Sequence, residues 1–191
     1  MLDAAPNSPL PSIAAAFDPS GADVLRFALA ERRAGRAAAI VTLVEIDGAS
    51  PRARGAQMAV AEDGRFAGSI SSGCLERAIV EEARAAMARF LDVTLPCGSG
   101  VDLLFSVNPS EEILHEACAT LAQRTPVALR FQTDGVQISP ATQNEKSAET
   151  YSRVYQPSLR ISAAGVGAEL VLLSHIARAA GHRFCAISPD E

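Results

Sequence analysis

The sequence predicts an α/β protein with a mixed α+β N-terminal domain followed by an incomplete Rossmann-like βαβ unit. Apolar runs of strand length alternate with segments of helical periodicity, and glycine-rich turns separate them. Residues 158–191 follow a strand–helix–strand pattern. We therefore expect a disordered leader at 1–20, a first domain at 21–139, a linker at 140–157 and a partial βαβ unit at 158–191.

Helical spacing and turn residues define the elements of the N-terminal half. Residues 23–34 place apolar side chains at helical intervals, and Gly35 can end the helix. The β-branched apolar run that follows is typical of a buried strand, and Glu62-Asp63-Gly64 indicates a hairpin turn. A second amphipathic repeat begins after the turn at 71–73. The expected elements are helices at 23–34 and 74–90 and strands at 37–46, 57–61 and 65–70.

The C-terminal half contains one further helix before the polar segment. Ser110 can cap this helix, with two glutamates in its first turn, and Asp134-Gly135 indicates a second hairpin. Residues 140–157 are rich in Ser, Thr, Asn, Gln and Glu and show no apolar period, so we expect no secondary structure there. The expected elements are strands at 101–107, 126–131, 135–139, 159–164 and 183–188, and helices at 110–121 and 168–180.

Composition excludes several classes of protein. The 17 Lys and Arg against 22 Asp and Glu give a net charge of −5, which argues against nucleic-acid or anionic-membrane partners. No window is apolar and long enough to cross a membrane, and residues 1–19 do not resemble a signal peptide. Four cysteines are too few for a disulfide framework, and the three histidines show no metal-ligand spacing with them. We expect a cytoplasmic protein without a metal site.

Residues 50–100 contain three glycine-rich turns, at 50–55, 68–76 and 97–100. Backbone N–H groups approach anions in such turns. The second turn opens a helix, whose N-terminus favours a phosphate or carboxylate and activates the thiol of Cys74. The alternative is that Cys74 is a small buried packing residue and Ser72 only an N-cap.

The three turns in this order resemble the XdhC/CoxI family, accessory factors of xanthine dehydrogenase and related molybdenum hydroxylases. The family's first motif corresponds to Gly48-Ala49-Ser50-Pro51-Arg52, with Gly55 and Met58 following. Its second corresponds to 68–76, where Ser72 replaces the usual glycine, and its Cys-Gly-x-Gly turn corresponds to 97–100. The resemblance covers roughly residues 23–110.

The resemblance implies that the chain binds molybdenum cofactor (molybdopterin), supports its sulfuration with a cysteine desulfurase, and delivers it to a molybdenum hydroxylase apoenzyme as a chaperone, not as an enzyme. It makes Cys74 and Cys97 candidates for contacts to sulfur or molybdenum, since thiolates are soft ligands. The implied cofactor-binding residues are Ser50, Arg52, Gly55, Ser71, Ser72, Gly73, Cys74, Glu76, Gly98, Ser99 and Gly100. We also expect a homodimer, because a half-built second unit exposes apolar faces.

Two other functions compete with the chaperone. A NAD(P)-dependent oxidoreductase would use the terminal unit through Gly165 and Gly167, but Ala163 replaces the first glycine of the fingerprint and Ser188 stands where an acidic residue is expected. NAD(P) is therefore not the expected cofactor. A sulfur carrier would act through Cys74 without holding the pterin.

Overall fold

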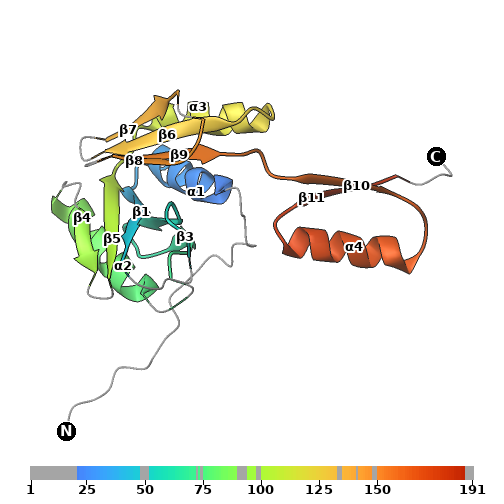
Figure 1. Cartoon of the computed structure of the whole chain (residues 1–191), viewed down its shortest axis with the longest axis horizontal. Helices are drawn as coiled ribbons and strands as arrows, with labels where there is room; N and C mark the ends of the chain where they lie inside the picture. The colour runs from blue at the N-terminus through green and yellow to red at the C-terminus, as the bar shows by residue number, and fades with distance from the viewer. Residues whose placement is uncertain are drawn as a thin grey trace, which may run out of the picture.

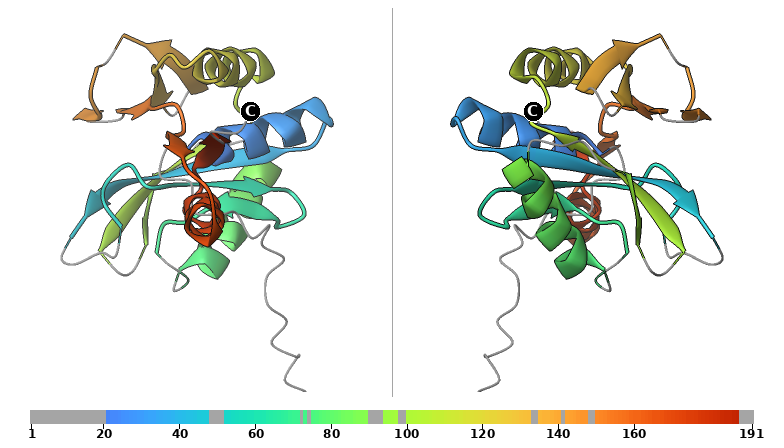
Figure 2. Two further views of the ribbon diagram at one scale, coloured as in Figure 1. Left: turned by 90° about the vertical axis from the view of Figure 1, so that its right-hand side faces the viewer. Right: turned by 90° about the vertical axis from the view of Figure 1, so that its left-hand side faces the viewer.

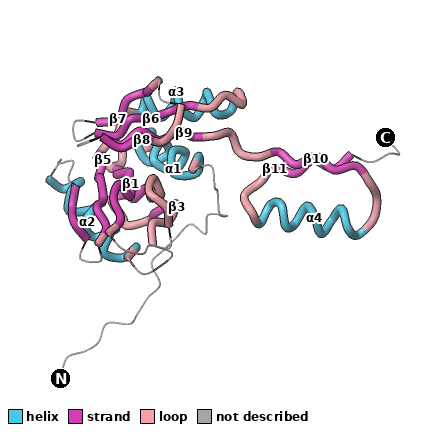
Figure 3. The backbone as a smooth tube through the Cα atoms, viewed as in Figure 1, coloured by secondary structure: helices cyan, strands magenta, loops and turns pink. Residues whose placement is uncertain are grey.

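A computed structural model describes residues 21–47, 52–71, 73, 75–89, 94–97, 100–132, 135–140, 142–147 and 150–187 of the chain. The predicted leader at 1–20 and Ser188 lie outside the described residues. The elements follow the order predicted from the sequence, with three strands added (Figure 3).

Five strands form an antiparallel sheet in the order β3-β2-β1-β5-β4. The central β1 is apolar along most of its length because both faces of the sheet are covered. The edge strand β4 was not predicted from the sequence and pairs with β5 alone. The bounds are β1 (Ala38–Ile46), β2 (Gln57–Ala61), β3 (Phe66–Gly68), β4 (Thr94–Cys97) and β5 (Val101–Val107).

Two helices cover opposite faces of this sheet (Figure 2). Helix α1 (Ala22–Arg33) packs with Ile40 and Ala59 in one cluster of buried residues. Helix α2 (Glu76–Arg89) packs with Val41 in the other. The alternation of side chains along a strand explains the division, since adjacent residues of β1 point to opposite faces.

A second antiparallel sheet, in the order β7-β6-β9-β8, packs with α3 above α1 (Figure 1). The predicted linker at 140–157 is wrong, because it contains two strands, and β9 pairs with β6 along its length. Polar composition concealed it: the buried residues of β9 are two tyrosines, Tyr151 and Tyr155, and one serine, Ser152. The bounds are α3 (Glu111–Ala122), β6 (Val127–Gln132), β7 (Gly135–Ser139), β8 (Glu145–Ser147) and β9 (Thr150–Tyr155).

The chain then forms the predicted βαβ unit, which extends away from the two sheets (Figure 1). Strands β10 (Arg160–Ala164) and β11 (Arg183–Ile187) pair in parallel, and α4 (Ala168–Ala179) connects them. A sheet of two strands packed against a single helix is too small to bury the apolar side chains of that helix. Large apolar side chains of α4 accordingly stay exposed, including Leu172 at 60% and Ile176 at 57%.

Candidate functional site

The three predicted glycine-rich turns leave the five-stranded sheet at the same end. Residue pairs near this end are Ile46 with Val101, Cys97 with Val101, and Met58 with Gly68. The turn after β3, the loop between β1 and β2, and the turn between β4 and β5 therefore all begin or finish there. Strands lie about 4.8 Å apart, so β3 and β5, three positions apart, are separated by about 14 Å across the sheet. The two strand ends are also staggered along β1, because Gly68 lies level with Val41 and Val101 lies level with Ile46.

The described part of this edge includes Arg52, Gly55, Ser71, Gly73, Glu76 and Gly100. Cys97 is the last residue of β4, and nothing beyond its backbone is described. The other residues predicted from the sequence, which lie outside the described residues, are Ser50, Ser72, Cys74, Gly98 and Ser99.

The carboxylate of Glu76 organises the turn that connects β3 to α2. Its Oε1 accepts hydrogen bonds from Ser69 Oγ at 2.8 Å and from the backbone N–H of Ser71 at 2.9 Å. Its Oε2 accepts from Ser71 Oγ and from the backbone N–H of Gly73 at 2.8 Å. Ser71 Oγ in turn accepts from the N–H of Leu75 at 2.6 Å. The donors of this turn thus bind the carboxylate of Glu76, the first residue of helix α2.

This arrangement fixes the charge of Glu76, which is only 5% exposed. Burial alone raises the pKa of a carboxyl group. Hydrogen bonds from Ser71 and Ser69 outweigh burial and lower the pKa of Glu76 to about 2. The backbone donors of Ser71 and Gly73 that we expected to face a ligand therefore hold this internal anion. Gly73 itself is exposed, and among the described residues no atom beyond its chain neighbours lies within 4 Å of the position of an added Cβ. A ligand can therefore approach the outside of the turn.

The second loop, between β1 and β2, is held by backbone bonds at Gly55. The N–H of Gly55 donates to the carbonyl of Leu43 at 2.7 Å, and Leu43 N–H donates to Ala56 at 2.9 Å. Gly55 has φ of 86°, and a Cβ here would overlap the hydroxyl of Tyr151. Both the backbone conformation and the space therefore require glycine.

Side chains of strand β9, which lies within the predicted linker at 140–157, hold this loop in place. Arg153 donates to the carbonyl of Gly55 and, at 3.1 Å, to Oε1 of Gln57. The fully buried Tyr155 hydroxyl donates to the same Oε1, while Gln57 Nε2 donates to Thr42 Oγ1 at 2.8 Å. Burial raises the pKa of Tyr155, so the phenol stays a donor. The run of Thr, Tyr and Val in β9 was the signal that could have found it.

The third turn is joined to the end of β1. The backbone N–H of Asp47 donates to the carbonyl of Gly100. Gly100 has φ of 73°, and a Cβ would overlap the carbonyl oxygen of Asp47. This contact holds the turn between β4 and β5 against the loop that contains Arg52. The third turn is thus in direct contact with the residue that follows β1.

The glycine turn of the βαβ unit lies elsewhere, at the start of α4. Gly167 caps this helix with φ of 102°, and the N–H of Gly165 donates to Ile187 at 3.2 Å. The carboxylate of Glu169 lies beside Gly167. A carboxylate at this helix start already interacts with the positive end of the dipole.

The described residues contain neither a membrane-spanning helix nor a cluster of metal ligands. No helix among them has the length and apolar character needed to cross a membrane. Within the same ranges, no three or more His, Cys, Asp or Glu side chains are placed to hold a metal ion.

Comparison with known proteins gives three similarities. Residues 31–92 match the model of the XdhC and CoxI family. The chain is 33% identical over 175 residues to the molybdenum cofactor insertion chaperone PaoD of Escherichia coli strain K12, a match that covers 83% of the chain and 55% of that protein. The chain therefore spans about half the length of this curated relative.

A solved structure shares the fold. The crystal structure described as a xanthine dehydrogenase from Bacillus halodurans superposes with a TM-score of 0.62 at 16% identity, covering 86% of the chain and 61% of that protein. At this identity the similarity supports the mixed α/β fold alone and gives no information about activity.

Proposed function

Because the chain belongs to the XdhC and CoxI family, we propose that it is a chaperone that binds molybdenum cofactor, supports its sulfuration and delivers it to a xanthine dehydrogenase-type molybdenum hydroxylase. The observation that supports the proposal is that the strands flanking three glycine-rich turns end on the same side of one sheet. Backbone-lined turns suit an anionic cargo. The molybdenum cofactor is cargo in this proposal, so the chain acts as a carrier and not as an enzyme.

The cofactor-binding surface in this proposal is the end of the five-stranded sheet where the three turns lie, and it runs across the strands from β3 to β4. Arg52 and Gly55 supply its centre, and the turn closed by Glu76 supplies one side. Gly98, Ser99 and Gly100 supply the other side. Strands β3 and β4 are four positions apart, about 19 Å. A cargo that contacts the turns next to both strands must therefore extend across most of this end of the sheet.

The direct test of delivery is transfer of the cargo. The chain loaded with cofactor is mixed with the apo form of a molybdenum hydroxylase, and hydroxylase activity is followed after the two proteins are separated. We expect activity to appear only when loaded chain is added. Equal activation by free cofactor and by loaded chain would contradict a chaperone role.

The cysteines are tested through sulfuration. Cys74→Ser and Cys97→Ser, singly and together, are expected to reduce the sulfurated fraction of bound cofactor after incubation with a cysteine desulfurase and cysteine. Cys185→Ser is the control, because Cys185 is exposed on β11. Undiminished binding and sulfuration in the double variant would remove both cysteines from the site. A persulfide found on Cys74 by mass spectrometry without bound pterin would favour a sulfur carrier.

We also propose that two copies associate through α4. Leu172 and Ile176 lie one turn apart and are both more than half exposed, so a second apolar face would cover them. Leu172→Glu with Ile176→Glu is expected to convert a dimer into a monomer in light scattering after size exclusion. Ile138→Glu, at an exposed apolar position on β7, is the control and should leave the mass unchanged. A monomeric wild-type chain would contradict this proposal.

A further inference from the structure

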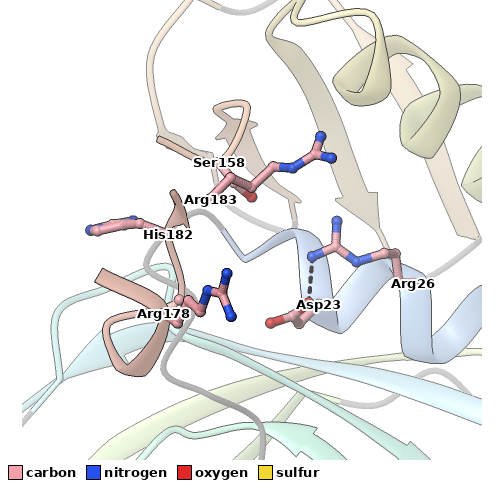
Figure 4. Close-up of a pocket in the computed structure, with 7 residues that line it drawn as sticks. Asp23, Arg26, Ser158, Arg178, His182 and Arg183 are labelled. Atoms are coloured by element: carbon pink, nitrogen blue, oxygen red, sulfur yellow. Dashed lines mark hydrogen bonds and ion pairs between the residues drawn. The ribbon is translucent and has the colours of Figure 1, made fainter. Parts of the chain in front are cut away.

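A pocket of about 420 Å³ lies between helix α1 and the βαβ unit (Figure 4). Helix α1 contributes Asp23 and Arg26 from its first two turns. The βαβ unit contributes residues from the end of α4 and the start of β11, together with the segment before β10. These lining residues are Ser158, Arg178, His182 and Arg183.

The pocket is positively charged. Three guanidinium groups line it with a single carboxylate, and that carboxylate, on Asp23, forms an ion pair with Arg26. Among the described residues, Arg178 and Arg183 make no ion pair, so their two charges face the pocket without compensation. In Figure 4 the guanidinium groups lie toward the middle of the view, while the ring of His182 turns away from them.

Helix geometry explains one of these arginines. A cation in the last turn of α4 is favoured by the negative end of the helix dipole, which accounts for Arg178. It accounts neither for Arg183, which begins β11, nor for Arg26 on a different helix. Arginines brought together from separate elements are typical of a site for a phosphate group, which accepts paired hydrogen bonds from a guanidinium. The volume suits a small molecule.

The pocket is connected to the candidate site through the start of α1. Gly21 lies so close to the guanidinium of Arg153 that a Cβ would overlap it, and Arg153 donates to the carbonyl of Gly55. Along α1, residue 26 lies about 8 Å beyond residue 21. Arg153 and the start of α1 therefore connect the loop at Gly55 to the wall of the pocket.

We propose that this pocket binds the phosphate end of a small molecule and, resting on the proposed function, that the molecule is the molybdenum cofactor. Arg178 and Arg183 would bind the phosphate oxygens, and Arg26 would complete the wall on the α1 side. The βαβ unit then has a binding role that does not involve its own glycine turn.

The first test uses pyrophosphate as the probe, titrated into the full chain by calorimetry. Arg178→Ser and Arg183→Ser are each expected to weaken binding about 10-fold, the effect of removing one hydrogen-bonded charge. Arg130→Ser removes the same charge from an exposed position on β6 and should leave the affinity unchanged. Thermal melts of all variants exclude unfolding as a cause. Absence of pyrophosphate binding to the wild type, or an equal loss of affinity in Arg130→Ser, would overturn the proposal that this pocket binds phosphate.

The second test asks whether the phosphate belongs to the cofactor. The double variant Arg178→Ser/Arg183→Ser is purified from a molybdenum-sufficient host, and its pterin content is compared with that of the wild type. Loss of pterin alongside loss of pyrophosphate affinity supports the proposal. Unchanged pterin content with lost pyrophosphate affinity overturns the assignment to the cofactor. A wild-type chain without pterin would instead refute the proposed function, and the calorimetry would still decide the pocket.

Discussion

Replacing Glu76 by glutamine is expected to lower the free energy of unfolding by about 3 kcal/mol at neutral pH. The reduction of the Glu76 pKa from 4.5 to about 2 corresponds to that energy. Each carboxylate oxygen accepts two hydrogen bonds, one of them from a backbone N–H. An amide NH2 in place of either oxygen would face a donor, so glutamine cannot reproduce the arrangement. Chemical denaturation measures the difference.

The stability difference between wild type and Glu76→Gln depends on pH, and the direction of this dependence follows from the lowered pKa of Glu76 in the folded state. Because folding lowers the pKa of Glu76, its contribution to stability is complete above the unfolded pKa of about 4.5 and is lost as the pH falls toward 2. The stability difference between wild type and Glu76→Gln should therefore shrink between pH 5 and pH 2, as a rough window. Glu45 and Asp63, whose pKa values are also lowered, titrate in both proteins and cancel.

Glu81→Gln is the matched control, because Glu81 is an exposed residue of the same helix. It should change stability by less than about 0.5 kcal/mol. A Glu76→Gln variant as stable as Glu81→Gln would contradict the account of the turn.

Replacing Gly55 by alanine is expected to destabilise the protein by about 2–5 kcal/mol and to weaken cofactor binding. The positive φ of Gly55 costs an L-residue about 1–2 kcal/mol. Overlap of the new Cβ with Tyr151 adds a further cost of overpacking, about 1–3 kcal/mol. The distortion falls on the loop that also contains Arg52, so binding and stability should decline together.

Two companion variants separate these causes. Gly35 has φ of 72° and open space around it, so Gly35→Ala reports the backbone term alone. Tyr151→Phe removes the hydroxyl that the Cβ would overlap, although the ring carbon Cζ remains 3.1 Å away. The double variant Gly55→Ala/Tyr151→Phe should therefore recover part of the lost stability. Equal losses in Gly35→Ala and Gly55→Ala would show that Tyr151 does not constrain the loop.

Elements that depend on local pattern could be predicted from the sequence. The apolar run of β1 identified a strand buried on both faces, and the spacing in α1 identified its helix. The three glycine-rich turns were also visible, because positive φ at Gly55 and Gly100 requires the residue type that the sequence shows. Their placement at the same end of one sheet depends on strand order, which no local pattern encodes.

What the sequence did not predict depends on contacts between distant segments. Strand β9 has few apolar residues, and its role became apparent only when Arg153 and Tyr155 were found on Gln57, almost a hundred residues earlier in the chain. Glu76 was a candidate ligand contact, yet its carboxylate binds the turn that precedes it. A carboxylate near a helix start reads the same in sequence whether its partner is internal or a ligand.

The central claim is that the turns at this sheet edge hold the cofactor, and the molybdenum and pterin content of the purified chain tests it most directly. Wild type and Glu81→Gln from a molybdenum-sufficient host should contain molybdenum and pterin in equal amounts, and Glu76→Gln and Gly55→Ala should contain little of either under conditions where they remain folded. Full cofactor content in both of these variants would contradict the claim.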